Sequence, residues 1–584
     1  MQSKPRPFSA FNGVFLATVG LGILTVAVPR SASAEDIYFV GYQYGPPGGS
    51  AGGWRNEASW FHDDQWFNFV VPTVSDTAIF DTGFDPQENG IPQIVHFGDS
   101  TVSTEPPYIP SPIPFPGGVA TVNRLEIRKG DFTFQLASDP ARGSLNVVDW
   151  IDIGPVDDHP QDSANLTVQG GTVKSSSVFV GTSGKGGLTV QAGGRLEAVP
   201  FIGSLNNGDG TLIVKDGGTV GSDFHAFIGY DRGSKGSVIV QAGGRLTVPD
   251  YGVYVGLGGN GSLVVKDGGI VEASVRGNDG VGIGTQSGSE GSVIVQTGGR
   301  LTTNALNVGL AGDGTLVVED GGIAESGYGR VARLAGSTGE ATVQGDGSRW
   351  DVTDTMFVGG HADTGVGGTG LLTVRDGGAV SIGSSLTTWR DGTVDVSDNG
   401  RILIGEGQIG DVTRGTILVG SGGTLAGDGT IIGDVVLNGG SLSPGHSPGL
   451  LTIDGDLRLG SNSVLDIEIG GLLGGSLYDQ LAVTGDATFD GQLHISFIDG
   501  FIPSLGDAFD LINVAGLSTG AFSAIEFSGL GSIYPLTTGF EDGVFRLYVG
   551  DAPSAVPEPG SVALMGCGFL GLLGYGLKRR KASA

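Results

Sequence analysis

Short apolar runs alternate with glycine-rich polar turns along most of the chain. Runs such as Val238-Ile239-Val240 are bounded by Gly, Asp, Asn and Ser, which is typical of short β-strands joined by tight turns. Helical periodicity over more than a few residues is confined to the two termini. The pattern predicts an all-β protein.

The strand pattern itself repeats. The phrase GSVIVQAGGRL at 236–246 returns with one change at 291–301. Gly-Gly turns of this kind recur at intervals of about 24 residues, and most are followed by an apolar-Gly pair such as Val180-Gly181. Three short strands in that length make one coil of a parallel β-helix. We therefore predict a right-handed parallel β-helix of about a dozen coils over residues 164–440.

The flanking regions differ from the repeats. Residues 35–163 contain a proline-rich break at 105–116 and are expected to form an N-terminal β cap, and 441–552 a C-terminal solenoid or β cap. LSPGHSPGLLTIDGDL (442–457) and YDQLAVTGDATFDGQL (478–493) resemble strand repeats near the ends of autotransporter-type passengers. WRNEASW and VPTVSDTAIF, near the start, resemble the opening of such bacterial solenoids. The resemblance implies a β-solenoid.

The N-terminus has the features of a secretory signal. A basic start is followed by an apolar run over 14–28 and a small-residue A-x-A site at 32–34. We predict a signal peptide over residues 1–34, with cleavage between Ala34 and Glu35.

The C-terminus reads VPEPGSVALMGCGFLGLLGYGLKRRKASA. Ser561–Leu577 carries no charge and, with Gly560, spans about 27 Å as a helix, enough to cross a hydrocarbon core. The basic cluster Lys578–Lys581 is expected to stay cytoplasmic. These features predict a C-terminal transmembrane helix.

The order Pro-Glu-Pro, glycine-rich span and basic cluster over 556–581 resembles the PEP-CTERM sorting signal of Gram-negative bacteria. The motif positions are Val556, Pro557, Glu558, Pro559, Arg579 and Arg580. The resemblance implies recognition by an exosortase-type protease in the inner membrane, transient anchoring there, removal of the tail, and delivery to the cell surface or extracellular matrix. A permanent C-terminal membrane anchor is the alternative.

Charge and cysteine content narrow the function. The formal net charge is −30 although both termini are basic, so the middle of the chain is more acidic still. Such a surface repels nucleic acid, and we predict no nucleic-acid partner. The one cysteine, Cys567, lies in the apolar span, so stability must come from stacking and backbone hydrogen bonds rather than disulfides.

Two sequence motifs suggest enzymes but lack the required context. Residues 445–449 match the nucleophile elbow G-x-S-x-G, which needs a strand-to-helix turn and an N–H after the serine, and Pro448 has none. Residues 256–261 match G-x-G-x-x-G, but a strand-like segment follows where a dinucleotide site needs a helix. The GDGT turns lack the next Asp of calcium-binding nonapeptides.

Acidic and histidine residues form no catalytic set. One repeat position carries a row of aspartates, which a solvated turn explains better than a unique catalytic pair: Asp216, Asp267, Asp320 and Asp376. The acids Asp63, Asp64, Asp157 and Asp158 lie in the cap region without a visible set of partners. The seven histidines are scattered and show no metal-ligand spacing. We expect no catalytic, cofactor or metal site and no enzymatic activity.

The turns alternate between QAGGRL-like and KDGG-like forms, so the duplicated unit is two coils. We predict that Arg195 and Arg245 point outward in every second coil, with Thr219 between them, which separates like charges. The leading hypothesis is an exported structural or adhesive β-solenoid at the bacterial surface or in the exopolysaccharide matrix. The alternative is a polysaccharide-binding or polysaccharide-cleaving β-helix.

Overall fold

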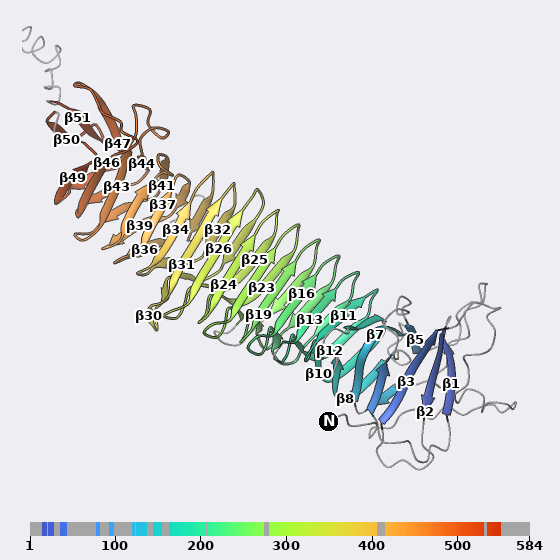
Figure 1. Cartoon of the computed structure of the whole chain (residues 1–584). Coiled ribbons are helices and arrows are strands. Elements are labelled where there is room, and N and C mark those ends of the chain that lie inside the picture. The colour runs from blue at the N-terminus through green and yellow to red at the C-terminus, as the bar shows by residue number, and fades with distance from the viewer. Residues whose placement is uncertain are drawn as a thin grey trace, which may run out of the picture.

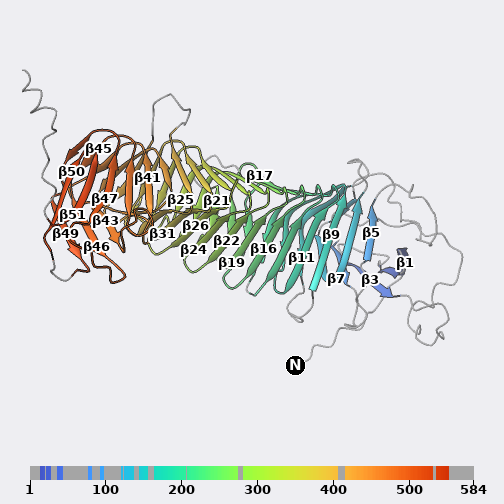
Figure 2. The same ribbon diagram turned by 90° about the horizontal axis from the view of Figure 1, so that it is seen from above.

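A computed structural model of the chain shows an elongated rod of stacked coils (Figure 1), which Figure 2 shows from above. It describes residues 14–19, 22–27, 36–43, 77–81, 93–97, 120–122, 124–136, 144–154, 163–205, 207–273, 280–405, 415–530 and 534–550.

Each regular coil contributes one strand to each of three parallel ladders. One coil consists of β16 (Lys235–Val240), β17 (Arg245–Val248) and β18 (Val253–Val255). Each strand pairs with its counterparts in the preceding and following coils, so that Val238 lies opposite Leu263 of the next coil. The expected three-stranded coil is thus confirmed, and the fold is an all-β parallel solenoid. Its right-handed winding stays a prediction.

The first ladder runs along the whole rod. Its strands are β5 (Gln93–Phe97), β7 (Arg124–Leu136), β9 (Ser163–Gly170), β11 (Lys185–Gln191), β13 (Asp209–Val214), β16, β19 (Asn260–Val265), β22 (Glu290–Val295), β24 (Asp313–Val318), β26 (Thr338–Gln344), β31 (Thr369–Arg375), β34 (Gly392–Val396), β37 (Thr424–Gly427), β40 (Ser441–Pro444), β43 (Val464–Ile469), β46 (Gln492–Phe497) and β49 (Ala524–Ser528).

The second ladder follows the Gly-Gly turns. Its strands are β6 (Ala120–Val122), β8 (Ser144–Ile153), β10 (Thr172–Val180), β12 (Arg195–Ile202), β14 (Thr219–Gly221), β17, β20 (Ile270–Ala273), β23 (Arg300–Val308), β25 (Ile323–Val331), β27 (Arg349–Val352), β32 (Ala379–Ile382), β35 (Arg401–Ile404), β38 (Thr430–Ile432), β41 (Leu450–Asp454), β44 (Gln480–Val483) and β47 (Ala508–Val514).

The third ladder lies across a corner from the second, and β8, β10, β12, β23 and β25 continue around that corner into it. Its other strands are β3 (Asp36–Gln43), β4 (Thr77–Asp81), the start of β7, β15 (Ala226–Ile228), β18, β21 (Val281–Ile283), β28 (Thr355–Val358), β33 (Ser385–Thr388), β36 (Thr416–Gly420), β39 (Asp434–Asn438), β42 (Leu457–Leu459), β45 (Ala487–Phe489) and β48 (Ser518–Gly520).

The core lies inside the coil, where alternate side chains of every ladder meet. Strand β16 alternates exposed or half-buried with fully buried positions, and Val238 and Val240 are its inward apolar residues. Because the pairing is in register, like residues stack on like, as Leu212, Val238 and Leu263 do. Each coil therefore buries its apolar face only against its neighbours, which is why the sequence must repeat.

The geometry of the Gly-Gly turns explains why glycine occupies both positions. In the turn 191–194 the N–H of Gly194 donates to the carbonyl of Gln191 at 2.9 Å, and the φ angles of Ala192 and Gly193 are 50° and 73°. Positive φ at both central positions defines a type I′ turn, which suits glycine. Gly194 has a different role, because a Cβ there would lie 2.5 Å from the carbonyl oxygen of Val168 in the preceding coil.

The ladders extend beyond the repeats that the sequence marks out. In the region 441–552, expected to be the closing solenoid or cap, parallel pairing continues to β49. The rod then closes with antiparallel strands, because β51 (Val544–Val549) pairs with β47 and with β50 (Leu536–Glu541).

At the other end, β1 (Val14–Val19) and β2 (Gly22–Ala27) form an antiparallel hairpin that joins β3. They fall within the predicted signal peptide, which stays a prediction. No helix among the described residues is both long and apolar enough to cross a membrane. The predicted transmembrane helix over 561–577 lies outside them, and the structure gives it no support.

Candidate binding groove

The sorting motif and the signal cleavage site lie outside the described residues. This holds for Val556, Pro557, Glu558, Pro559, Arg579 and Arg580, and for Ala34 and Glu35. The described structure therefore covers the solenoid and neither of these two sites.

The arginine column follows the predicted arrangement. Thr219 lies directly between Arg195 and Arg245 in the second ladder, and Ile270 lies between Arg245 and Arg300. The arginine side chains are half-exposed and point away from the core. Two rises of a parallel ladder separate successive arginines by about 9.6 Å.

The structure also places a carboxylate beside each arginine of this column, which the spacing of the repeats did not predict. Arg195 contacts Glu197 at 2.6 Å on its own strand, whereas Arg245 contacts Glu272 of the next coil at 2.7 Å. Each arginine thus has a nearby acid, so its charge is compensated locally as well as spaced.

The recurring aspartates occupy solvated turns. Asp216, Asp267 and Asp376 are exposed, and each lies 3.7–3.9 Å from the basic residue before it. Their φ angles of 51–53° are the left-handed conformation that Asp tolerates better than most residues. Turn geometry accounts for the recurrence of aspartate at this position.

The G-x-S-x-G segment is a turn between two strands, β40 and β41, and not a strand-to-helix elbow. Ser447 donates a hydrogen bond to Glu468, and His446 Nε2 lies 3.5 Å from Asp395 Oδ2, so the serine and histidine face different partners. Within the described ranges, no group of His, Cys, Asp and Glu is arranged to hold a metal ion.

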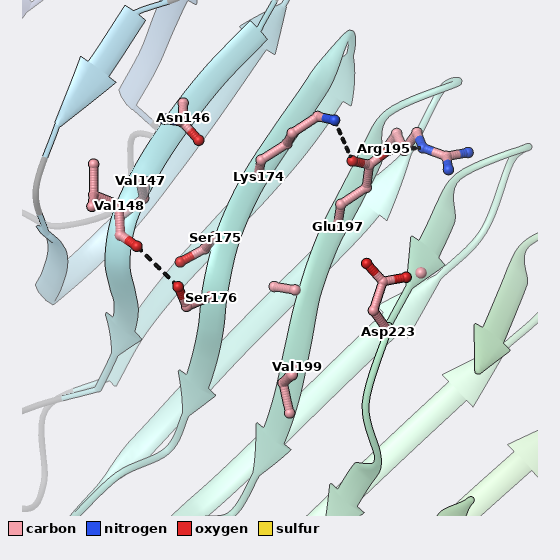
Figure 3. Close-up of a pocket in the computed structure, with 12 residues that line it drawn as sticks. Asn146, Val147, Val148, Lys174, Ser175, Ser176, Arg195, Glu197, Val199 and Asp223 are labelled. Carbon is pink, nitrogen blue, oxygen red and sulfur yellow. Dashed lines mark hydrogen bonds and ion pairs between the residues drawn. The ribbon is translucent and has the colours of Figure 1, made fainter. Parts of the chain in front are cut away.

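A groove with a volume of about 580 Å³ lies on the outer surface where the second and third ladders meet (Figure 3). Strands β8, β10 and β12 form its floor, and Asp223, on the loop between β14 and β15, forms part of its wall. We call this the corner groove. Its lining residues are Asn146, Val147, Val148, Lys174, Ser175, Ser176, Arg195, Glu197, Ala198, Val199, Gly221 and Asp223.

One end of the corner groove is charged. Lys174 Nζ lies 2.6 Å from Glu197, which also accepts from Arg195 at 2.6 Å (Figure 3). Partial burial raises the pKa of Glu197, but the hydrogen bonds from the two cations outweigh it, and the net direction is downward. The carboxylate is therefore a fixed hydrogen-bond acceptor at neutral pH.

Aromatic side chains cover the third ladder beside the groove. Phe179, Phe201, Phe227 and Tyr254 occupy one outward column in four successive coils. Neighbouring ring centroids lie 4.8, 4.8 and 5.9 Å apart, with interplanar angles of 19–24°, so the rings form a continuous stack.

Three further aromatic residues surround this stack and are exposed. Tyr230 meets Phe201 and Phe227 edge-on, each at 5.2 Å between centroids. Phe224 and Tyr251 project from the loops between β14 and β15 and between β17 and β18, with centroids 4.8 Å apart. The stack and these exposed rings form what we call the aromatic strip, and Phe224 directly follows Asp223 of the groove wall.

Sequence analysis missed the aromatic strip, although a signal for it exists. An aromatic residue stands two positions before the glycine of the apolar-Gly pair in four consecutive repeats: Phe179-Val180-Gly181, Phe201-Ile202-Gly203, Phe227-Ile228-Gly229 and Tyr254-Val255-Gly256. The next three repeats carry Gly282, Asn307 and Arg330 at that position, and the repeat after them carries Phe357. The stack of four neighbouring rings is thus confined to one part of the rod.

The C-terminal residues match a known protein family. Residues 555–581 match the PEP-CTERM protein-sorting motif. The chain ends in a PEP-CTERM sorting signal. The match covers the tail that the sequence assigns to it and implies processing by an exosortase-type enzyme.

A short part of the chain is similar to an autotransporter adhesin. Over 89 residues, or 15% of its length, the chain is 38% identical to the adhesin BmaC autotransporter of Brucella suis biovar 1 (strain 1330). That stretch covers 3% of the adhesin's length. A crystal structure of a TibC-catalysed hyper-glycosylated TibA fragment superposes on 69% of the chain and all of the fragment, with 18% identity and a TM-score of 0.31. The sorting signal and the similarity to an autotransporter adhesin together support an exported, cell-surface protein.

Proposed function

We propose that this protein is a non-enzymatic structural and adhesive rod, held at the surface or in the exopolysaccharide matrix of a Gram-negative-type bacterium. The observation that carries the proposal is a sorting motif at 555–581 placed directly after a closed solenoid, whose last strand β51 ends at Val549. A rod delivered by such a signal has its long lateral faces available for contact.

The build of the rod suits this role. Within the described residues, the first ladder contains 17 strands, which at about 4.8 Å a coil gives a stack roughly 80 Å long. Backbone hydrogen bonds link every coil to both neighbours, so the rod needs no disulfide in the oxidising exterior.

The absence of an enzymatic role is part of the proposal. The outward carboxylates come in rows and lie beside basic residues, as Asp216 does with Lys215 and Glu272 with Arg245. A glycoside-cleaving pair would instead be a single pair of carboxyls with different environments. The outward carboxylates therefore fit a surface on which acidic and basic side chains neutralise one another better than they fit a catalytic pair.

Processing at both ends completes the proposal. The signal peptide over 1–34 starts export, the helix over 561–577 holds the chain in the inner membrane, and an exosortase-type protease removes the tail near Pro557–Pro559. Cell fractionation and mass spectrometry test this: the surface form is expected to begin at Glu35 and to lack Lys578–Lys581. An intact basic tail on surface protein would favour a permanent anchor.

A sorting variant separates delivery from folding. Replacing Pro557, Glu558 and Pro559 together by alanine is expected to leave the chain in the inner membrane, while Asp551→Ala, before the motif, leaves delivery unchanged. A strain expressing the sorting variant should lose cell-to-surface attachment or matrix cohesion to the level of a deletion strain. Attachment that survives deletion of the protein would contradict the adhesive role.

A further inference from the structure

We propose that the corner groove and the aromatic strip together bind an uncharged polysaccharide chain. The inference rests on the proposed surface function and names a ligand class for one defined part of the rod. Three observations lead to it. Residues 146–254 present exposed aromatic rings and fixed polar groups beside them, and the chain as a whole carries a large negative charge.

The exposed aromatic rings are the first property. Phe224, Tyr230 and Tyr251 are 44%, 38% and 37% exposed, although large apolar side chains usually lose most of their surface to water on folding. They project from corner loops and an adjoining turn. Tyr230 packs edge-on against Phe227 of the stack, and Phe224 packs against Tyr251, so the three rings are held in place. Rigid aromatic side chains give contact area at low entropic cost.

The support of these rings is specific. The corner loop 222–225 is fixed because Ser222 Oγ donates to the carbonyl of Phe224 at 2.9 Å. The next loop is tied to it, because the N–H of Gly252 donates to His225 Nδ1 at 3.2 Å. His225 also contacts Tyr251, with 5.0 Å between ring centroids. The two loops that carry Phe224 and Tyr251 therefore form one connected platform.

The polar groups beside the platform are the second property. The groove offers the amide of Asn146, the hydroxyls of Ser175 and Ser176, and the carboxylates of Glu197 and Asp223. A sugar ring has apolar C–H faces and a rim of hydroxyls, so it suits a surface of aromatic rings bordered by planar hydrogen-bonding groups. The hydroxyls of Ser175 and Ser176 donate to the carbonyls of Ser177 and Val148, so their oxygens keep acceptor capacity for the hydroxyls of a sugar.

Charge is the third property and selects among polysaccharides. The chain has a net charge of −30, and the two cations of the groove, Lys174 and Arg195, are already paired with Glu197. A polyanionic polysaccharide would meet repulsion from the whole rod without a free cation in the groove to offset it. The site therefore fits a neutral polysaccharide.

The test is binding of the full chain, purified in detergent, to a panel of neutral polysaccharides (cellulose, a β-1,3-glucan, a mannan and a galactan) and acidic ones (alginate and hyaluronate). The paired variant Phe224→Ala/Tyr251→Ala removes two rings from exposed loops. The control Phe527→Ala/Tyr534→Ala removes two rings of similar exposure, 39% and 45%, near the C-terminal end of the rod.

We expect the unaltered chain and the control to bind at least one neutral polysaccharide, and the paired variant to bind it at least about tenfold more weakly, as the loss of two stacking contacts implies. Far-ultraviolet circular dichroism should be the same for all three chains. A second variant, Asp223→Ala, should weaken binding without removing a ring.

Three results would overturn the inference. They are failure of the unaltered chain to bind any neutral polysaccharide, equal binding by the paired variant and the unaltered chain, and preference for the acidic polysaccharides. Self-association that the paired variant abolishes would show the strip to be a contact between copies instead. A chain that reaches the surface and supports attachment but binds no neutral polysaccharide would refute this inference and leave the proposed function standing.

Discussion

Ala192, Ala242 and Thr297 adopt left-handed backbone conformations at the first central position of their turns, with φ of 50°, 49° and 50°. The alternate copies carry Asp216, Asp267 and Asp320 at the equivalent position with the same geometry. Asp and Asn tolerate this conformation well, whereas a β-branched residue there is strained. The alternation that sequence analysis attributed to charge spacing therefore also distributes backbone strain.

Thr297→Asn is expected to stabilise the rod. The exposed Thr297 side chain loses no packing, and Asn relieves the unfavourable φ, so the free energy of unfolding should rise by about 0.5–1 kcal/mol. Urea unfolding followed by circular dichroism measures it. The reverse exchange, Asp267→Thr, should lower the free energy of unfolding by a similar amount, and a shift of the same sign in both variants would refute the argument.

Asp479 is the buried carboxyl with the clearest pH signature. Burial raises its pKa to about 7, although the N–H groups of Glu468 and Gly449 donate to it at 2.7 and 2.9 Å and act in the opposite direction. The side chain is 2% exposed. Because the folded pKa lies above the unfolded value, the folded state binds the proton more tightly, and this stabilisation is complete only below the unfolded pKa.

Because of Asp479, we expect the free energy of unfolding to fall by about 1.4 kcal/mol per pH unit as the pH rises between roughly 4 and 7. Asp479→Asn carries no titrating proton, so the difference between its urea-unfolding profile and that of the unaltered chain should show this slope. Asp267→Asn, on an exposed turn, controls for the loss of one negative charge. A pH-independent difference would show that Asp479 does not titrate in this range.

At the scale of elements, the sequence determines the inside of each coil more strictly than the outside. Inward positions must be apolar and in register, so the period alone predicted the three strands and the Gly-Gly turns. The outward arginine column could be predicted only because the turn sequence itself repeats. Outward positions obey no such rule, and the aromatic stack from Phe179 to Tyr254 passed unnoticed.

The outward column also holds a residue that no pattern predicted. Arg330 is almost completely buried on the third ladder, where its Nη1 donates to Asn307 at 3.2 Å. The hairpin of β29 (Gly360–His361) and β30 (Gly365–Val366) is an insertion next to it. Burial, together with Arg330 and Arg333, lowers the pKa of His361. Insertions of this kind interrupt the repeat, so a period cannot forecast them.

A comparison of neighbouring residues on β17 tests the division between inside and outside. Leu246→Ala removes a fully buried side chain and should cost about 2–4 kcal/mol of unfolding free energy. Arg245→Ala removes a half-exposed ion pair with Glu272 and should cost less than about 1 kcal/mol. Equal losses in urea unfolding would mean that the outward ion pairs stabilise the stack as much as the core does.

At the scale of the whole molecule, a stack of parallel strands must end somewhere, and an open end is a template for another chain. At the C-terminal end, the second ladder is closed where β51 reverses direction against β47, with Phe545 and Leu547 buried beneath it. Arg546 adds an ion pair to Asp510 of β47. The antiparallel pairing uses the hydrogen-bonding groups of β47 that a further coil would need on this ladder.

Removing this closure should convert the rod from a closed unit into one that associates end to end. A chain ending at Leu530 lacks β50 and β51 and exposes the edge of β47 with Phe509 and Ile512, which are buried in the full chain. Sedimentation velocity should show concentration-dependent association for this chain. A chain ending at Gly550 keeps both strands and should not gain association, and neither should Arg546→Ala, which loses only the ion pair. Since the coils before β47 keep their own pairing, circular dichroism should retain the β signal in each case. Identical sedimentation of the two truncated chains would show that β50 and β51 are not what limits the stack.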